Sequence, residues 1–231
     1  MSSIIGEKPC IDADGNYYKQ VKIGSQTWTS ENLKTTKYRD GTPIPLVTDG
    51  STWAGLSTAA YSYYDNDPDN VNFGGDLNIT TLGHAGYGNL YNWYAVDTGK
   101  LAPEGWHVPT DDEIKELEMY LGMSQEEADG RSYRGTNEGS KLAGNTDLWT
   151  DGDLDNNPEF GTSGFTGLPG GYRSFNNGNY SDVGLYDYFW SSTEKGSSTA
   201  WLRALNYYVS EIFRNFFNKN YGFSVRCVRD N

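Results

Sequence analysis

Cysteine, histidine and basic side chains are scarce in this chain of 231 residues. It contains two Cys and two His, and its 18 Lys and Arg stand against 31 Asp and Glu, which gives a net charge of −13 at pH 7. So few cysteines and histidines exclude a disulfide scaffold and a four-cysteine zinc site, and they leave little for a His-rich metal centre. Because phosphate binding needs a basic surface, the acidic charge also disfavours nucleic acid as a ligand.

Long apolar runs and targeting signals are missing as well. No stretch approaches the roughly 20 apolar residues of a membrane-spanning helix, so the sequence predicts no membrane span. The first residues lack the basic start and apolar centre of a secretory signal, so either the protein is not exported by that route or its signal has been removed. No Pro/Ser-rich linker divides the chain, and we therefore expect one domain over residues 1–231.

Aromatic residues and glycine, by contrast, are abundant. The chain has 18 Tyr, 9 Phe, 7 Trp and 28 Gly, and this glycine content is well above the average of about 7 %. Many glycines with many aromatics predict short elements and tight turns, in which wide flat side chains fill a core or line a binding surface. The composition is more typical of a binding module than of a helical enzyme.

The first predicted element is a β-hairpin over residues 17–30. Gly24 and Ser25 form its two-residue turn, with glycine supplying the positive φ. The Asp-x-Asp-Gly cluster from Asp12 to Asn16 precedes it and resembles part of a calcium loop. It lacks the acid at the twelfth position that such a loop requires, so the hairpin turn is favoured over a metal site.

Two helices are predicted in the middle of the chain, at residues 89–97 and 110–121. Thr110 and Glu113 form a capping box at the start of the second helix. Capping and the helix dipole explain its acidic residues, so we do not assign them to catalysis. Short strands follow at 165–168, 171–174, 188–191, 200–208 and 222–228. Helices between hairpins predict an α+β domain whose terminal strands pair.

Several motifs follow one another along nearly the whole chain. They are VKIGSQTW (21–28), ENLK (31–34), GNLYNWYAV (88–96), GWHVPT (105–110), GFTGLPGGYR (164–173), FWSSTE (189–194) and GFSVRCVRD (222–230). Together they resemble the Fibrobacter succinogenes major paralogous domain, which is common in Bacteroidetes-type bacteria. The resemblance implies a C-type-lectin-like fold in its formylglycine-generating-enzyme-like variant, with two main helices packed on short antiparallel sheets and long irregular loops. Variable proteins of diversity-generating retroelements share that fold.

Residues 206–221 carry the strongest functional signal. Twelve of these sixteen positions are Asn, Tyr, Ser, Ile or Phe, residues whose codons all arise by changing adenines in an AAY codon, as in retroelement diversification. The same residue types suit binding, because aromatic rings give rigid contact area while Asn and Ser adapt their hydrogen bonds. The predicted ligand-binding residues are Asn206, Tyr207, Tyr208, Ser210, Ile212, Phe213, Asn215, Phe216, Phe217, Asn218, Asn220 and Tyr221.

The alternative for this segment is an ordinary strand whose aromatic residues pack in the core. Phe216 and Phe217 argue against that alternative, because adjacent residues of a strand point to opposite faces. Trp190 and Trp201 are expected to support the binding surface as packed aromatics.

The sequence offers little for catalysis. Formylglycine-generating enzymes use a reactive, copper-binding cysteine pair, whereas Cys10 and Cys227 lie near the two ends of this chain and would form either a structural disulfide or buried thiols. His107 precedes a helix cap, where a structural histidine is favoured over a general base. His84 lies in a glycine-rich loop without an assignable partner. We predict that the protein is not an enzyme and needs no cofactor.

Asp151 to Asp155 is the one further metal candidate, since its alternating acids could bind Ca²⁺. Thr162 stands where the loop would need its twelfth-position acid, so solvated loop acids are favoured and no metal is predicted. The sugar-binding motif of calcium-dependent lectins is absent, and a lectin-like fold alone does not predict carbohydrate binding.

The sequence therefore predicts a recognition protein that binds a protein ligand on another cell, a phage or a host through residues 206–221. It would act at the cell surface, in secreted form or on a phage particle. The alternative is a cell-envelope module that binds polysaccharide or serves structurally, without diversification.

Overall fold

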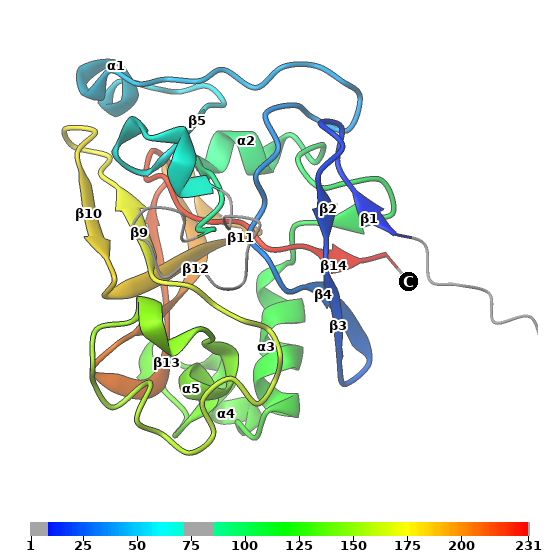
Figure 1. Cartoon of the computed structure of the whole chain (residues 1–231), viewed down its shortest axis with the longest axis vertical. Helices are drawn as coiled ribbons and strands as arrows, with labels where there is room; N and C mark the ends of the chain where they lie inside the picture. The colour runs from blue at the N-terminus through cyan, green and yellow to red at the C-terminus, as the bar shows by residue number, and fades with distance from the viewer. Residues whose placement is uncertain (1–8, 72–85, 231) are drawn as a thin grey trace, which may run out of the picture.

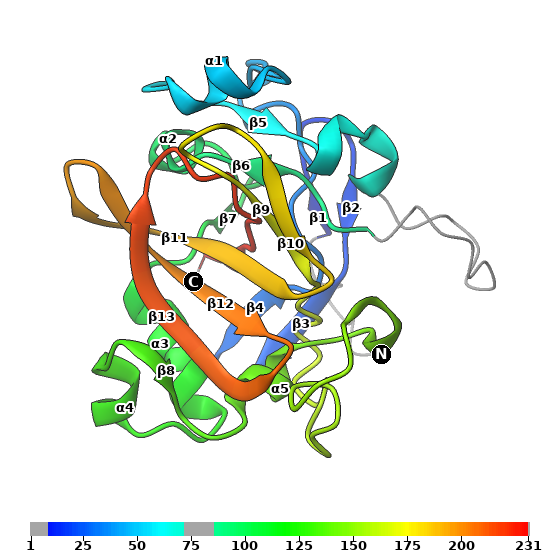
Figure 2. The ribbon, with the colours of Figure 1, turned by 90° about the vertical axis from the view of Figure 1, so that its left-hand side faces the viewer.

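A six-stranded sheet dominates the computed structural model, which describes residues 9–71 and 86–230 (Figure 1). Its strand order is β10-β9-β11-β12-β13-β8, and all neighbours are antiparallel except β9 and β11. Figure 2 shows β11, β12 and β13 side by side. The strands are β8 (Ser132–Arg134), β9 (Gly170–Arg173), β10 (Tyr180–Val183), β11 (Tyr186–Gly196), β12 (Thr199–Asn206) and β13 (Val209–Asn218).

A four-stranded sheet joins the two ends of the chain, in the order β3-β4-β14-β7. Val228 pairs with Trp28, and the β3–β4 turn has Gly24 at φ 61°. The predicted hairpin and the pairing of the terminal strands are therefore confirmed. The strands are β3 (Gln20–Ile23), β4 (Gln26–Thr29), β7 (Trp106–His107) and β14 (Val228–Arg229). Two smaller pairs are β1 (Cys10–Ile11) with β2 (Tyr17–Tyr18), and β5 (Tyr61–Ser62) with β6 (Leu90–Tyr91).

Helices are short. The capping box of α3 is present, with the Thr110 hydroxyl accepting from the Glu113 N–H and the Glu113 carboxylate accepting from the Thr110 N–H. The helices are α1 (Gly50–Ala54), α2 (Trp93–Asp97), α3 (Asp111–Tyr120), α4 (Gln125–Asp129) and α5 (Glu138–Leu142), with 3₁₀ turns η1 (Tyr64–Asn66), η2 (Pro68–Val71) and η3 (Thr146–Leu148). Only α3 exceeds five residues in the part of the chain that the structure describes.

The predicted fold class, an α+β C-type-lectin-like fold with two main helices packed on short sheets, is wrong. Strands account for 33 % of the structure and helices for 19 %, and the helix predicted at 89–97 is only the five-residue α2. Leu90 and Tyr91 pair with β5 instead of starting a helix, and Asn92 caps the short α2. The β-branched and aromatic residues after Tyr186 favour long strands, which tertiary pairing extends to as many as 11 residues.

The large sheet separates two apolar clusters. Trp190, Leu202 and Ala204 pack with Trp93 and Phe223 on one side. On the other side of the sheet lies the second cluster. There Phe189, Leu205 and Ile212 pack with Trp28 of β4 and Leu117 of α3, among others. Because side chains alternate along a strand, neighbouring residues of β11 and β12 fill different clusters. The two clusters fix the orientation of every strand between them.

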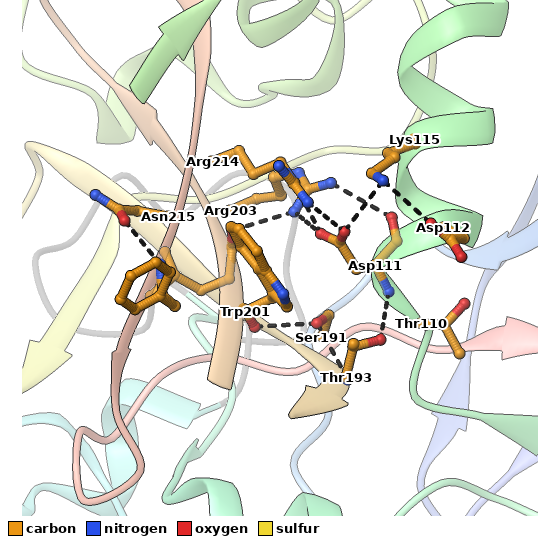
Figure 3. A network of polar contacts seen from close by, with 12 residues as sticks. Thr110, Asp111, Asp112, Lys115, Ser191, Thr193, Trp201, Arg203, Arg214 and Asn215 are labelled. Carbon is orange, nitrogen blue, oxygen red and sulfur yellow. Dashed lines mark hydrogen bonds and ion pairs between the residues drawn. The ribbon is translucent and has the colours of Figure 1, made fainter. Parts of the chain in front are cut away.

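A buried ion network fastens α3 to this sheet (Figure 3). Arg203 of β12, which is fully buried, donates from Nη1 to Oδ1 of Asp111 (2.7 Å) and from Nε to Oε1 of Glu118 (2.6 Å). Arg214 of β13 donates to Oδ2 of Asp111 (2.6 Å), and Arg134 of β8 to Oε2 of Glu118 (2.6 Å). Burial alone would raise the pKa of Asp111, but Arg214 and Arg203 hold it below its ordinary value.

Removing one charge of this network should destabilise the protein strongly. Glu118→Gln leaves Arg134 buried without a carboxylate and Arg203 with Asp111 alone, which should lower the free energy of unfolding by about 3–5 kcal/mol. Urea denaturation measures the change. The matched control is Glu126→Gln on the exposed surface of α4, which should stay within about 0.5 kcal/mol of the wild type. Equal stability of the two variants would contradict the role given to the network.

Candidate functional site

One side of the large sheet carries a continuous set of exposed and half-buried aromatic side chains, which we call the aromatic face. Cross-strand register brings them together: Tyr188 in β11 pairs with Ala204 in β12, which pairs with Phe213 in β13, and Phe213 pairs with Tyr133 in β8. Directly paired residues share a face of the sheet. The aromatic face comprises Tyr133, Tyr172, Tyr186, Tyr188, Phe213, Phe217 and Tyr221.

Three rings of the aromatic face form one stack with the buried Phe223. Tyr186 and Tyr188 lie 5.1 Å apart at 12°, Tyr188 and Phe223 5.1 Å apart at 17°, and Phe223 and Tyr221 5.1 Å apart at 12°. Phe223 is fully buried, and Tyr172 adds an edge-on contact to both Tyr188 and Tyr221 at 5.5 Å. The two inner rings of the stack, Tyr188 and Phe223, thus have a stacked ring on each side, and the Tyr188 hydroxyl donates to Asp182 (3.4 Å).

A cluster of hydroxyl groups lies at the β12–β13 turn. The Asn206 amide donates to the Tyr133 hydroxyl (2.6 Å), which lies 3.4 Å from the hydroxyl of Tyr208. Tyr208 is 45 % exposed, whereas Asn206 is buried. The buried Asn206 thus orients the Tyr133 hydroxyl through its hydrogen bond. Tyr208 exposes a hydroxyl group and a ring to solvent.

The predicted ligand-binding residues do not all reach the surface. Ile212 is fully buried in the apolar cluster that faces α3, and Asn206 is buried as described. Ile212 therefore packs in the core, in the way the strand-core alternative describes. The side chains that are exposed or half-buried are Tyr207, Tyr208, Ser210, Phe213, Asn215, Phe216, Phe217, Asn218, Asn220 and Tyr221.

Phe216 and Phe217 lie on opposite faces of β13. Phe217 contacts Phe213, Tyr221 and Phe223 at the aromatic face. Phe216 packs edge-on against Trp201 at 5.4 Å on the other face. Trp190 lies beneath the stack, 4.5 Å from Phe223.

Two cations within the segment are anchors rather than surface groups. Arg214 is buried, bonds to Asp111 and lies 3.8 Å from the Trp201 ring (Figure 3). Lys219 is buried, pairs with Glu194 and lies 4.5 Å from the Trp93 ring. Both are among the four positions of residues 206–221 outside the Asn, Tyr, Ser, Ile and Phe set.

Sequence reasoning missed the aromatic residues that come from other strands. Tyr133, Tyr172, Tyr186 and Tyr188 precede the segment by 18 residues or more. The only local signal is the i, i+2 spacing of Tyr186 and Tyr188, which puts both on one face of a strand. Tyr133 and Tyr172 join them only through tertiary pairing.

The two cysteines are buried and free. Burial, followed by Asp12, raises the pKa of the Cys10 thiol to about 12, and burial with Cys10 nearby raises that of Cys227. Thiolates are the reactive form of cysteine, so neither thiol is activated as a nucleophile.

His107 is held between two carboxylates. Its Nδ1 lies 2.6 Å from Asp230 and its Nε2 2.7 Å from Glu113. Glu113 chiefly, with Asp230 adding and burial opposing, raises the pKa of His107. Because both ring nitrogens are engaged, His107 fastens the C-terminal segment to the start of α3. His84 lies outside the described residues.

The acids of the predicted calcium candidate hold their own loop. Asp151 accepts from the Asn156 amide (2.8 Å), and Asp155 accepts from the Gly152 N–H (2.9 Å). Over residues 9–71 and 86–230, no group of three or more His, Cys, Asp or Glu side chains is arranged to hold a metal ion. Within the same ranges, no helix has the length and apolar character needed to cross a bilayer.

Comparison with known proteins gives a family match. The family model of the Fibrobacter succinogenes major domain matches residues 21–229. No curated protein and no solved structure matches the chain.

Asp187 is a buried acid beneath the aromatic face. It follows Tyr186 in β11 and is fully buried, so it faces the opposite side of the sheet. Burial raises the pKa of Asp187 to about 7, while Arg226 and the Leu168 N–H oppose the shift. A perturbed acid can mark a catalytic site, but this carboxyl group has no access to a substrate.

The contribution of Asp187 to the stability of the protein should therefore fall as the pH rises from about 4 to about 7. The folded protein holds the Asp187 proton more tightly than the unfolded chain, so deprotonation favours unfolding. Asp187→Asn should remove this slope and raise the free energy of unfolding at pH 8 by up to about 4 kcal/mol. Denaturation at several pH values measures both effects. The control Asp112→Asn, at a side chain that is 90 % exposed, should keep the slope. A loss of stability at pH 8 in Asp187→Asn would contradict the assignment.

Proposed function

The chain belongs to the Fibrobacter succinogenes major domain family. For this member we propose a non-enzymatic recognition function. The aromatic face and residues 215–218 of β13, which we call the rim, would bind a protein ligand. One observation carries the proposal: seven exposed or half-buried aromatic side chains from four strands and the segment after β13 form one continuous surface. A large apolar patch framed by polar groups is typical of an interaction site.

The order of these rings supports tight recognition. Stacking and edge-on contacts already fix Tyr188 and Tyr221, so binding need not immobilise them. Pre-organised side chains lose little entropy when a ligand binds. Asn215 and Asn218 lie beside the rings and can adapt their hydrogen bonds to a partner.

The ring geometry favours a protein over a polysaccharide. Sugar rings and cations interact with open aromatic faces, but both faces of Tyr188 are occupied by Tyr186 and Phe223. The exposed ring and hydroxyl group of Tyr208 lie at the β12–β13 turn, and these suit the aromatic side chains and carbonyl groups of a polypeptide.

We extend the proposal to diversification by a retroelement. Most residues of the segment that reach the surface belong to the Asn, Tyr, Ser, Ile and Phe set, whereas the two cations outside it, Arg214 and Lys219, are buried anchors. Because the buried cations hold the segment to the rest of the protein, the surface side chains can change without detaching it. Ile212 and Asn206, which belong to the set but are buried, are positions at which a change would cost stability.

Diversification makes a prediction about the gene. A second, template copy of the region for residues 206–221 should carry AAC or AAT codons at varied positions, with a reverse transcriptase gene nearby. Sequencing of independent isolates should show changes at Tyr208, Phe213 and Phe217 while Arg214 stays constant. Isolates without a template copy and without variation would exclude diversification. The proposal that the aromatic face binds a protein would be unaffected, because it is tested separately.

Recognition makes a prediction about binding. Panning a phage-displayed random dodecapeptide library against the wild type should enrich related peptides. Replacing Tyr208 and Phe217 together by Ser should weaken those peptides by about tenfold or more, measured by fluorescence anisotropy, with only a small fall in melting temperature.

The matched control is Tyr17→Ser, at a tyrosine of β2 that is 57 % exposed, which should bind as the wild type does. Failure of the wild type to enrich any peptide would overturn the proposal. A glycan array that binds the wild type but not the double variant would then favour the polysaccharide alternative.

A further inference from the structure

Phe216, on the side of β13 away from the aromatic face, has two exposed cations beside its ring. The Arg131 guanidinium lies 4.5 Å from the ring centroid, and the Lys195 ammonium lies 5.9 Å from it and 5.5 Å from the Trp201 ring. Arg131 precedes β8 and Lys195 lies near the end of β11. The fold thus brings two positive charges from distant segments to one ring.

Neither cation is neutralised by an acid of its own. The acids nearby serve other cations: Asp111 pairs with Arg214, Asp129 with Lys115, and Glu194 with Lys219. Arg131 donates to the neutral side chain of Asn215 at 3.1 Å. Among the described residues, no carboxylate oxygen lies within 4.0 Å of the charged nitrogens of Arg131 or Lys195.

These charges stand out because the whole chain carries a net charge of −13. An acidic surface repels an acidic partner, so a partner with carboxylates gains most where the local charge is reversed.

The strand edge next to Phe216 is open. β8 pairs with β13 only from Ile212 to Arg214, so residues 215–218 have no strand on that side in the described parts of the chain. The Phe216 N–H donates to the Asn215 side chain rather than to another strand (3.0 Å). An extended polypeptide could therefore lie along this rim (Figure 2).

We propose that the ligand presents an acidic extended segment to this rim, and that Arg131 and Lys195, both beside Phe216, bind its carboxylates. The inference rests on the proposed function, since it names the chemistry of the same protein ligand. The aromatic face would supply contact area, and the two cations would select a partner with Asp or Glu beside its apolar residues.

The test uses the same random dodecapeptide library. Peptides enriched on the wild type should be rich in Asp and Glu next to aromatic residues. The double variant Arg131→Glu, Lys195→Glu should weaken them by about tenfold or more, and should bind synthetic copies carrying Lys in place of Glu better than the wild type does. Lys22→Glu, at an exposed lysine of β3, is the matched control and should change affinity by less than about twofold.

Rescue by charge reversal separates recognition from a packing role, because loss of the Arg131 contact with Phe216 cannot improve binding of a basic peptide. Enriched peptides without an acidic bias, or an affinity that the double variant leaves unchanged, would overturn this inference while the proposed function stands. A library that yields no peptides on the wild type overturns both.

Discussion

Three neighbouring strands of the large sheet each send one arginine to two carboxylates on one helix. Arg203, Arg214 and Arg134 meet Asp111 and Glu118 away from water. A slip of one residue in β13 would turn Arg214 to the other face and leave a buried charge unpaired, which is costly. The network therefore fixes the register of β13, and with it the choice of side chains that the strand presents at the aromatic face.

Alternation along β13 joins anchoring and recognition in one strand. Phe213 and Phe217 lie on the aromatic face, while Ile212 and Arg214 face the helix. Ile212 and Arg214 hold β13 against the helix α3. The residues on the aromatic face are therefore not needed for that contact. A surface built in this way can differ widely in its contacts while the sheet beneath it stays the same.

The two sides of β13 also differ in chemistry. One side carries the exposed and half-buried rings of the aromatic face, and the other offers Phe216 with Arg131 and Lys195. A ligand that contacts both would have to combine apolar or aromatic groups with carboxylates. Such a combination of shape and charge gives selectivity that neither side has alone.

Local sequence determined the features that depend on neighbouring residues. The Gly24 turn, the Thr110–Glu113 capping box and the family motifs all rest on short spacings, and the structure and the family match confirm them. The fold class was wrong because helix 89–97 looked plausible locally, whereas Leu90 and Tyr91 pair with a strand some 30 residues away.

The binding surface depended on tertiary structure. Composition singled out residues 206–221, but only long-range pairing decides that Ile212 is buried while Phe213 is not. The same pairing brings Tyr133 and Tyr172 to the surface and puts Arg131 beside Phe216. The period of a strand can be read from its sequence, but which of its two faces meets solvent is set by the elements that pack against it.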